Sequence, residues 1–220
     1  MTPKGIRQQL SDVYFRLIVT SLSVKQFHPK EKSLSGGGIS IGSFSPGSIS
    51  LKDISYEEIY REIEGNNSYH IKLPDGGLLI FQYTFDSAGI LTKHRLCYFP
   101  SFELPTVDEA PSLYENDELY GDVTLKKLVR FPIRFDYDPE SHKDVDHPKS
   151  HLTLGQYENC RIPVGSAVSP NAFVMFLLRN FYFRLYQKNK EVLDKNLHHT
   201  SAIPTITDAE RRIAHFMNGR

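Results

Sequence analysis

The stretch LLIFQYTFDSAGILTKHRLCYF, residues 78–99, holds the clearest strand pattern in the chain. It contains two apolar runs, 78–85 and 90–99, separated by the turn sequence Asp-Ser-Ala-Gly. A third run, residues 69–73, precedes them across the turn Pro-Asp-Gly-Gly. The three runs predict an antiparallel meander. Both faces of the middle run begin apolar, which places that strand in the interior of the sheet.

Upstream of the meander, residues 1–24 predict an N-terminal helix that Thr2 caps. Its apolar positions recur at three- and four-residue spacing and form one face: Ile6, Leu10, Val13, Tyr14 and Leu17. Residues 25–50 are rich in Gly and Ser and predict a loop with one short strand at 39–41. A capping-box signature at Ser55 and Glu58 then predicts a short helix up to Gly65.

Downstream of the meander, two more strands are predicted over 125–138 and 152–164. Pro132 places the first of these at a sheet edge or beside a bulge. A Ser-Pro pair opens the strongest helical pattern, residues 171–188, which is apolar almost all round and is expected to pack across the sheet. Residues 189–220 predict a linker followed by a short helix.

These elements predict a single α+β domain over residues 1–220. Its sheet is expected to be mostly antiparallel, built from the meander and a hairpin. The long aromatic-rich helix and the N-terminal helix are expected to cover the sheet.

The composition excludes several classes of protein. The 220 residues carry 26 Lys and Arg against 26 Asp and Glu, so bulk positive charge does not hold nucleic acid. Two cysteines, Cys97 and Cys160, are too few for a disulfide scaffold or a four-cysteine zinc site. No apolar run approaches the ~18–20 residues of a membrane span, and the first residues lack the layout of a signal peptide. We therefore expect a cytoplasmic protein with no membrane partner.

Ionisable residues gather between Arg134 and Arg161. Because side chains alternate along a strand, Arg134, Asp136 and Asp138 should share one face. Three of the nine histidines follow within ten residues: His142, His147 and His151. A guanidinium, two carboxylates and a histidine-rich loop form a candidate site.

One interpretation of this segment is metal-free acid/base chemistry on a phosphodiester. His147 and His151 would transfer protons with Asp136 as the third catalytic group. The anionic phosphate would be held by cations on this and a neighbouring strand: Arg134, Arg161, Lys93 and Arg95.

Two other interpretations stay open. In the first, a divalent metal ion is ligated by Asp136, Asp138, His147 and His151, although Pro148 disfavours the helix that the His-x-x-x-His spacing would suit. In the second, the same residues form a structural network of paired charges without catalysis.

Two further segments carry charged residues of one sign only. Residues 103–122 hold seven acidic residues and no basic one, and residues 159–190 hold five basic residues and no acidic one. Aromatic residues interleave with the basic segment, as they do in proteins that bind single-stranded nucleic acid, but their helical spacing favours a core position. A chain with oppositely charged segments also suits docking to a partner protein.

The motifs Arg-Phe-Asp-Tyr-Asp (134–138), His-Pro-x-Ser-His-Leu-Thr (147–153) and Asn-Cys-Arg-Ile-Pro-Val (159–164), with the Pro-x-x-Phe helix start, carry a resemblance. They are similar to an uncharacterised bacterial domain-of-unknown-function family encoded near mobile-element and phage-defence genes. The Arg-x-Asp and His run also loosely resembles small toxin-type ribonucleases.

The family resemblance implies a bacterial antiviral-defence or mobile-element protein but supplies no established activity. With the candidate site and the ribonuclease likeness, we expect this protein to bind or cleave RNA or single-stranded DNA. Its most concrete form is a ribonuclease-like effector, with no cofactor or with a divalent metal ion. The alternative is a non-catalytic interaction subunit that docks a partner protein of the same operon.

Overall fold

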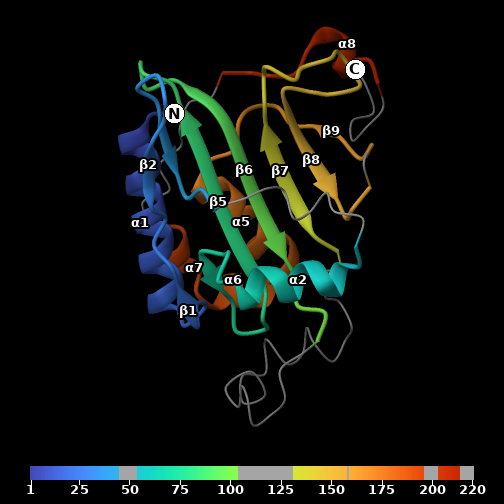
Figure 1. The fold of residues 1–220 in the computed structure, drawn as a ribbon. Helices are drawn as coiled ribbons and strands as arrows, with labels where there is room; N and C mark the ends of the chain where they lie inside the picture. Colours follow the sequence, from blue (N-terminus) through green and yellow to red (C-terminus); the bar gives the residue numbers. More distant parts are fainter. Residues whose placement is uncertain (45–53, 104–130, 158, 196–202, 214–220) are drawn as a thin grey trace.

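The computed structural model describes residues 1–44, 54–103, 131–157, 159–195 and 203–213. Within these ranges, one antiparallel sheet carries helices on both of its faces, which confirms the predicted α+β class (Figure 1). The order is β1-β4-β5-β6-β7-β8-β9, and β2 joins through β3, which pairs with β5. The strands are β1 (Lys25–Gln26), β2 (Glu31–Ser33), β3 (Ile39–Ile41), β4 (Ile71–Lys72), β5 (Leu78–Phe85), β6 (Leu91–Phe99), β7 (Ile133–Tyr137), β8 (Ser150–Leu154) and β9 (Ile162–Pro163).

The helices begin where the sequence places their caps. The Thr2 hydroxyl accepts a hydrogen bond from Gly5 N, and Ser55 and Glu58 form a complete capping box. None of the helices in the described ranges is both long enough and apolar enough to cross a bilayer. The helices are α1 (Pro3–Val19), α2 (Tyr56–Gly65), α5 (Pro170–Phe181), α6 (Phe183–Lys188), α7 (Lys190–Leu193) and α8 (Asp208–Arg211).

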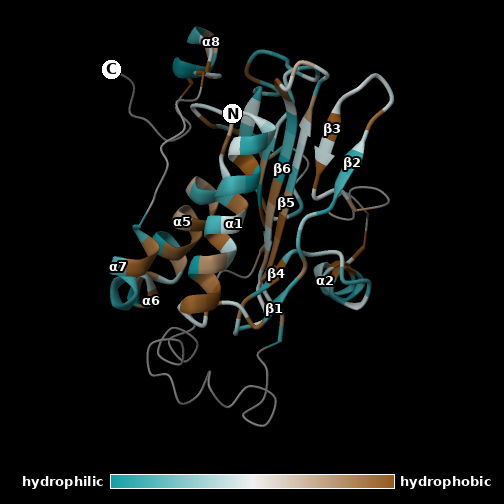
Figure 2. Ribbon diagram, turned by 90° about the vertical axis from the view of Figure 1, so that its left-hand side faces the viewer, coloured by the Kyte–Doolittle hydropathy of each residue, from teal (hydrophilic) through white to brown (hydrophobic). Residues whose placement is uncertain are grey.

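The two faces of the sheet are covered differently (Figure 2). Helices α1 and α5 lie on one face and bury the larger apolar cluster, which includes Phe81, Leu96 and Phe173. Helix α2 lies on the opposite face over a smaller cluster around Ile59 and Phe99. The middle strand of the meander, β5, is buried on both faces along its first half, as its sequence predicts.

The strand predictions need three corrections. Residues 25–50 are not only a loop, because β1 and β2 form beside the predicted strand β3. Strand β7 is an interior strand between β6 and β8, and Pro132 precedes it rather than marking an edge. The predicted strand over 152–164 is two antiparallel strands, since Gly155, at φ +68°, turns the chain after β8.

The helix predictions need two corrections. The helix over 171–188 is broken at Tyr182, whose backbone leaves helical geometry at φ −125° and ψ 42°. Its hydroxyl donates to the buried Asp75 carboxylate over 2.6 Å, so a tertiary contact overrides helical periodicity. The predicted linker contains α7 as well as the predicted α8. Most of the acidic segment and the first part of the strand predicted over 125–138 lie outside the described residues.

Candidate functional site

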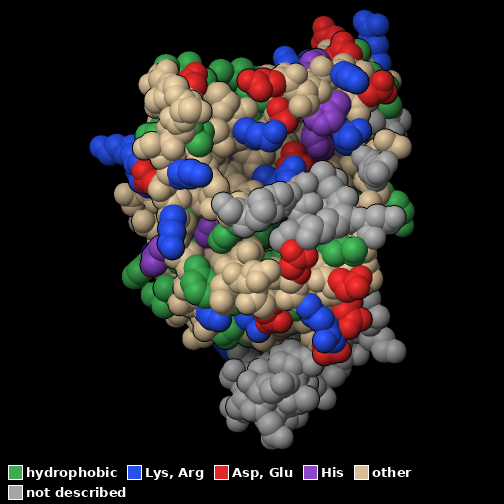
Figure 3. Space-filling view, in the orientation of Figure 1, with side chains coloured by type: hydrophobic (Ala, Val, Ile, Leu, Met, Phe, Trp, Pro, Cys, Tyr) green, Lys and Arg blue, Asp and Glu red, His purple; other side chains and the backbone are tan. Residues whose placement is uncertain are grey.

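Strand alternation sends the charged side chains to the α2 side of the sheet. Four polar residues on neighbouring strands are in direct register and form what we term the polar row: Gln82, Arg95, Asp136 and His151. On the upper half of this face, side chains of Lys, Arg, Asp, Glu and His gather above α2 (Figure 3). The α2 side of the sheet therefore has an apolar end under the helix. Beyond the helix lies what we term the charged end, which contains Arg95, Asp136 and His151 of the polar row.

Asp136 is the centre of the charged end. Its side chain is 8% exposed, with Arg95 Nε 2.8 Å from Oδ1 and Arg134 Nε 2.5 Å from Oδ2. Burial acts to raise the pKa of this carboxyl, but the attraction of Arg134 and Arg95 outweighs it and holds the pKa below its usual range. Asp136 is therefore an ionised carboxylate whose two oxygens are both bound by guanidinium groups.

His151 faces this carboxylate from β8. Its Nδ1 lies 3.0 Å from the Pro148 carbonyl oxygen, and its Nε2 lies 3.7 Å from Asp136 Oδ2. Because a carbonyl only accepts, the bond to Pro148 assigns the proton of the neutral ring to Nδ1 and leaves Nε2 as the basic nitrogen. Burial lowers the pKa of His151 below its usual value.

His147 completes the cluster from the loop between β7 and β8. Its ring centroid lies 4.9 Å from that of His151 at an interplanar angle of 69°. Burial lowers the pKa of His147, and the nearby positive charge of Arg161 lowers it further. Arg161 itself contacts the Asp146 carbonyl over 3.5 Å.

The remaining predicted residues form a second pair beside the first. Lys93 Nζ lies 2.6 Å from Asp138 Oδ2, and Ser141 also bonds that carboxylate. Short contacts thus join Arg95, Arg134 and His151 to Asp136, whereas Lys93 pairs with Asp138 and Arg161 contacts the Asp146 backbone.

The model of the family described as "Uncharacterized conserved protein (DUF2290)" matches residues 22–218. The chain belongs to the DUF2290 family. No curated protein and no solved structure matches it. The match agrees with the resemblance to a family of unknown function. The chemistry of this DUF2290 protein must therefore be inferred from its own geometry.

The metal ligands predicted for this DUF2290 protein do not converge. Both oxygens of Asp136 are bound by arginines, and Asp138 is paired with Lys93 and Ser141. Among the described residues, a different set has ligand atoms close together: His142, Asp144 and Glu210. No spacing motif reveals this set, because Glu210 lies far along the chain from the other two.

The aromatic residues near the basic segment divide into two groups. Tyr182 and Tyr186 are buried, as their helical spacing predicts. Tyr157, in the turn after β8, is 77% exposed, and Phe131, before β7, is 43% exposed. The second group is available to a ligand, as is Phe183 of α6, which is 55% exposed.

The lowered pKa values of His147 and His151 determine the charge of these two rings near neutral pH in this DUF2290 protein. Both imidazoles are neutral, and the His151 side chain is only 3% exposed. The positive charge of this region comes from the guanidinium and ammonium groups and does not depend on the protonation state of the histidines.

Proposed function

We propose that this DUF2290 protein binds the phosphodiester backbone of a single-stranded nucleic acid at the charged end of its sheet. The observation that carries the proposal is the sharing of one carboxylate, Asp136, by two guanidinium groups. The family resemblance adds the setting, a bacterial antiviral-defence or mobile-element module.

The charge of the site supports this proposal. Arg95 and Arg134 share the Asp136 carboxylate, Lys93 pairs with Asp138, and Arg161 contacts the Asp146 carbonyl oxygen. Four cations thus lie around the two carboxylates Asp136 and Asp138, although the whole chain has a formal charge of +0. A local excess of this kind attracts a phosphate backbone without a basic overall composition.

The exposed aromatic rings favour a single strand over a duplex. A side chain at Gly155 would lie 3.3 Å from the Tyr157 ring and 3.9 Å from Phe131, so these two residues flank the same turn. Base–aromatic stacking contributes roughly 1–3 kcal/mol per base and requires unpaired bases. Tyr157 lies beyond the end of β8 whereas His151 lies near its start, so a single strand bound at both would run along β8.

Cleavage of the bound strand is the stronger form of the proposal, and the histidine pair favours it. The half-buried His147 lies beside Arg161, while the His151 side chain is 3% exposed and its Nε2 faces Asp136, so His147 is the ring that a substrate would reach. The neutral His147 imidazole would accept the proton of an attacking hydroxyl, such as the 2′-hydroxyl of RNA, and the imidazolium so formed would return that proton to the 5′-oxygen as its bond to phosphorus breaks.

Binding is tested by fluorescence anisotropy with labelled single-stranded RNA, single-stranded DNA and duplex DNA over a range of salt concentrations. We expect Arg161→Gln to weaken single-strand binding by about tenfold and to reduce the slope of log K against log[salt] by about 1. The matched control is Arg61→Gln, an exposed arginine on α2 that pairs with Glu57. Equal affinity of both variants and the wild type would contradict the proposal.

Cleavage is followed on the same labelled strands with and without EDTA. His147→Gln should abolish cleavage while binding persists, because the phosphate-holding cations remain. Cleavage that survives the change removes His147 from the chemistry. If no nucleic acid is bound at low salt, the interaction-subunit alternative replaces this proposal, and co-purification with the products of the native operon tests it.

A further inference from the structure

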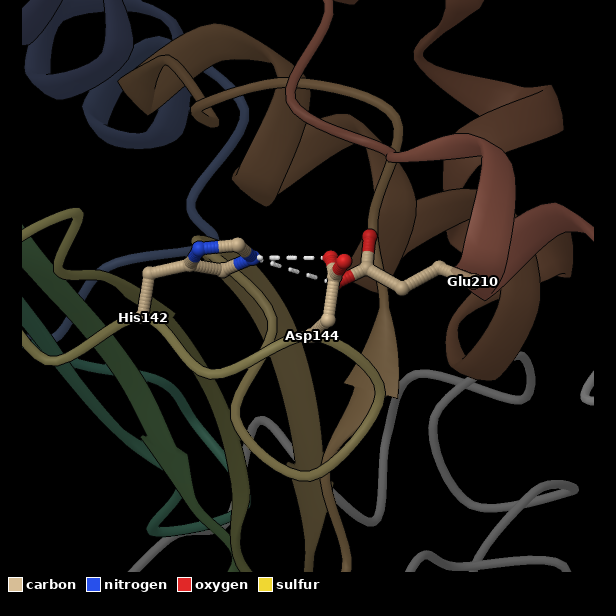
Figure 4. Close-up of side chains that lie close together, drawn as sticks. All are labelled: His142, Asp144 and Glu210. Carbon is tan, nitrogen blue, oxygen red and sulfur yellow. Dashed lines mark ion pairs between the residues drawn. The ribbon is translucent and has the colours of Figure 1, made fainter.

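Three side chains outside the charged end converge on one point (Figure 4). His142 and Asp144 lie in the loop between β7 and β8, and Glu210 lies in α8. His142 Nε2 is 3.5 Å from Asp144 Oδ1 and 3.6 Å from Glu210 Oε1. The ligand atoms of all three lie within 4.8 Å of one another.

The buried atoms of this cluster lack the hydrogen bonds that burial normally requires. The Glu210 side chain is 0% exposed, and its Oε1 has no hydrogen-bond partner among the described residues. His142 Nε2 is buried and unpartnered in the same way. Unsatisfied buried polar atoms are rare, and a buried carboxylate oxygen without a donor requires a compensating positive charge.

The second carboxylate oxygen of Glu210 holds the side chain in place. Its Oε2 accepts a hydrogen bond from Thr207 N over 2.9 Å, as part of the capping box of α8. The capping box therefore fixes the carboxylate, and the remaining oxygen is turned toward His142 (Figure 4). A ligand oxygen held in this way needs little rearrangement to bind a cation.

We infer that His142, Asp144 and Glu210 bind a divalent transition-metal ion, with zinc as the best fit. Two ligands about 2.05 Å from one tetrahedral zinc lie about 3.3 Å apart, and the distances of 3.5 and 3.6 Å are close to this value. Imidazole nitrogen disfavours magnesium and calcium, which prefer oxygen ligands alone. A water molecule would complete the tetrahedron.

The position of the cluster would let a bound ion join two separate segments of the chain. Residues 203–213 already contact β9 and its surroundings through Thr205, whose N donates to the Gly165 carbonyl over 2.9 Å. A metal ion would add a link from α8 to the β7–β8 loop. The same loop holds His147, because Lys143 N donates to the His147 carbonyl over 3.0 Å and His147 N to the Lys143 carbonyl over 2.8 Å. Metal binding would therefore order the loop that carries His147.

The test uses the full chain, stripped with EDTA and titrated calorimetrically with zinc, magnesium and calcium. We expect one zinc per chain and no comparable binding of magnesium or calcium. Asp144→Asn and Glu210→Gln should each weaken zinc binding by at least about tenfold, the size of effect that loss of even an outer-shell partner produces. Asp144 is 59% exposed, so its variant should fold, and glutamine at position 210 keeps the capping box.

Two controls make the test specific. Asp208→Asn alters an acidic residue of α8 that is 89% exposed and should leave zinc binding unchanged. His147→Gln alters the other histidine cluster and should also leave zinc binding unchanged. Cobalt substitution should give the visible absorption of a tetrahedral site, and this absorption should be lost in the Asp144 and Glu210 variants. Absence of stoichiometric zinc binding, or binding that depends on His147 and not on Asp144, would overturn the inference.

Discussion

The two ends of the sheet surface that faces α2 differ in chemistry although they share the same strands. At one end Leu78, Ile80 and Phe99 pack with Ile59 of α2. Two residues beyond Ile80 on the same face, β5 carries Gln82, whose register partner on β6 is Arg95. Alternation alone assigns a side chain to a face, but the position of a covering helix decides whether that face becomes core or a binding surface.

Removing the shared carboxylate should produce the largest effect at the charged end. We expect Asp136→Ala to lower the free energy of unfolding by about 3–5 kcal/mol, because it removes the buried carboxylate that both Arg95 and Arg134 bind. Urea denaturation followed by circular dichroism measures the change. Asp138→Ala is the control, with a loss of about 1 kcal/mol or less, since its partner Lys93 is half exposed. Equal losses in the two variants would show that the charged end has no buried centre.

A cavity at the apolar end should have the next largest effect. Ile59 is 0% exposed, and Ile59→Ala should lower the free energy of unfolding by about 3 kcal/mol through lost burial and the space left behind. The same urea experiment measures it. If the two ends are functionally distinct, the folded variant keeps the wild-type affinity for single strands. A parallel loss of affinity would show that α2 contributes to the binding surface.

Low pH should destabilise the protein through buried His94, which lies on the face of the sheet opposite the charged end. His94 lies on β6 beside Arg95 but points to the other face, where its Nε2 accepts a hydrogen bond from Val168 N over 2.8 Å. Burial lowers the pKa of His94 to about 4. Between the usual value of about 6.5 and this value the unfolded chain binds a proton that the folded chain does not, so stability falls as pH falls.

The expected loss from His94 is about 2 kcal/mol at pH 5 relative to pH 7.5. Urea denaturation at the two pH values measures it, and His94→Gln should show a smaller difference between them. His70, whose pKa burial lowers to about 3, should contribute in the same direction. A pH-independent stability would contradict the neutral state of His94.

Replacing the whole charged centre should have the smallest effect on stability and a full effect on binding. In the triple variant Arg95→Met, Asp136→Leu and Arg134→Met, the three charges that bind one another are removed together, so the free energy of unfolding should change by about 1 kcal/mol or less. Anisotropy should then show that single-strand affinity is lost. Retained affinity in a stable triple variant would remove the charged end from the proposed function.

Local chemistry predicted much of the fold. The caps at Thr2, Ser55 and Ser169 and the alternation along β5 are readable because each depends on neighbours within four residues. The same alternation correctly placed Arg134 and Asp136 on one face. Interruptions were missed at Gly155 and Tyr182, since one depends on the pairing of β8 and the other on a bond to Asp75.

Patterns within a few residues were thus enough to establish the α+β class, most helix starts and the set of residues at the charged end. Long-range packing settled which of these residues meet: the register of β6, β7 and β8 aligned Arg95, Asp136 and His151, and α8 brought Glu210 to His142. The physical reason is the distance along the chain over which each interaction acts. Caps and alternation are short-range steric and hydrogen-bonding preferences, whereas strand register and helix docking depend on the burial of surfaces distant in the chain.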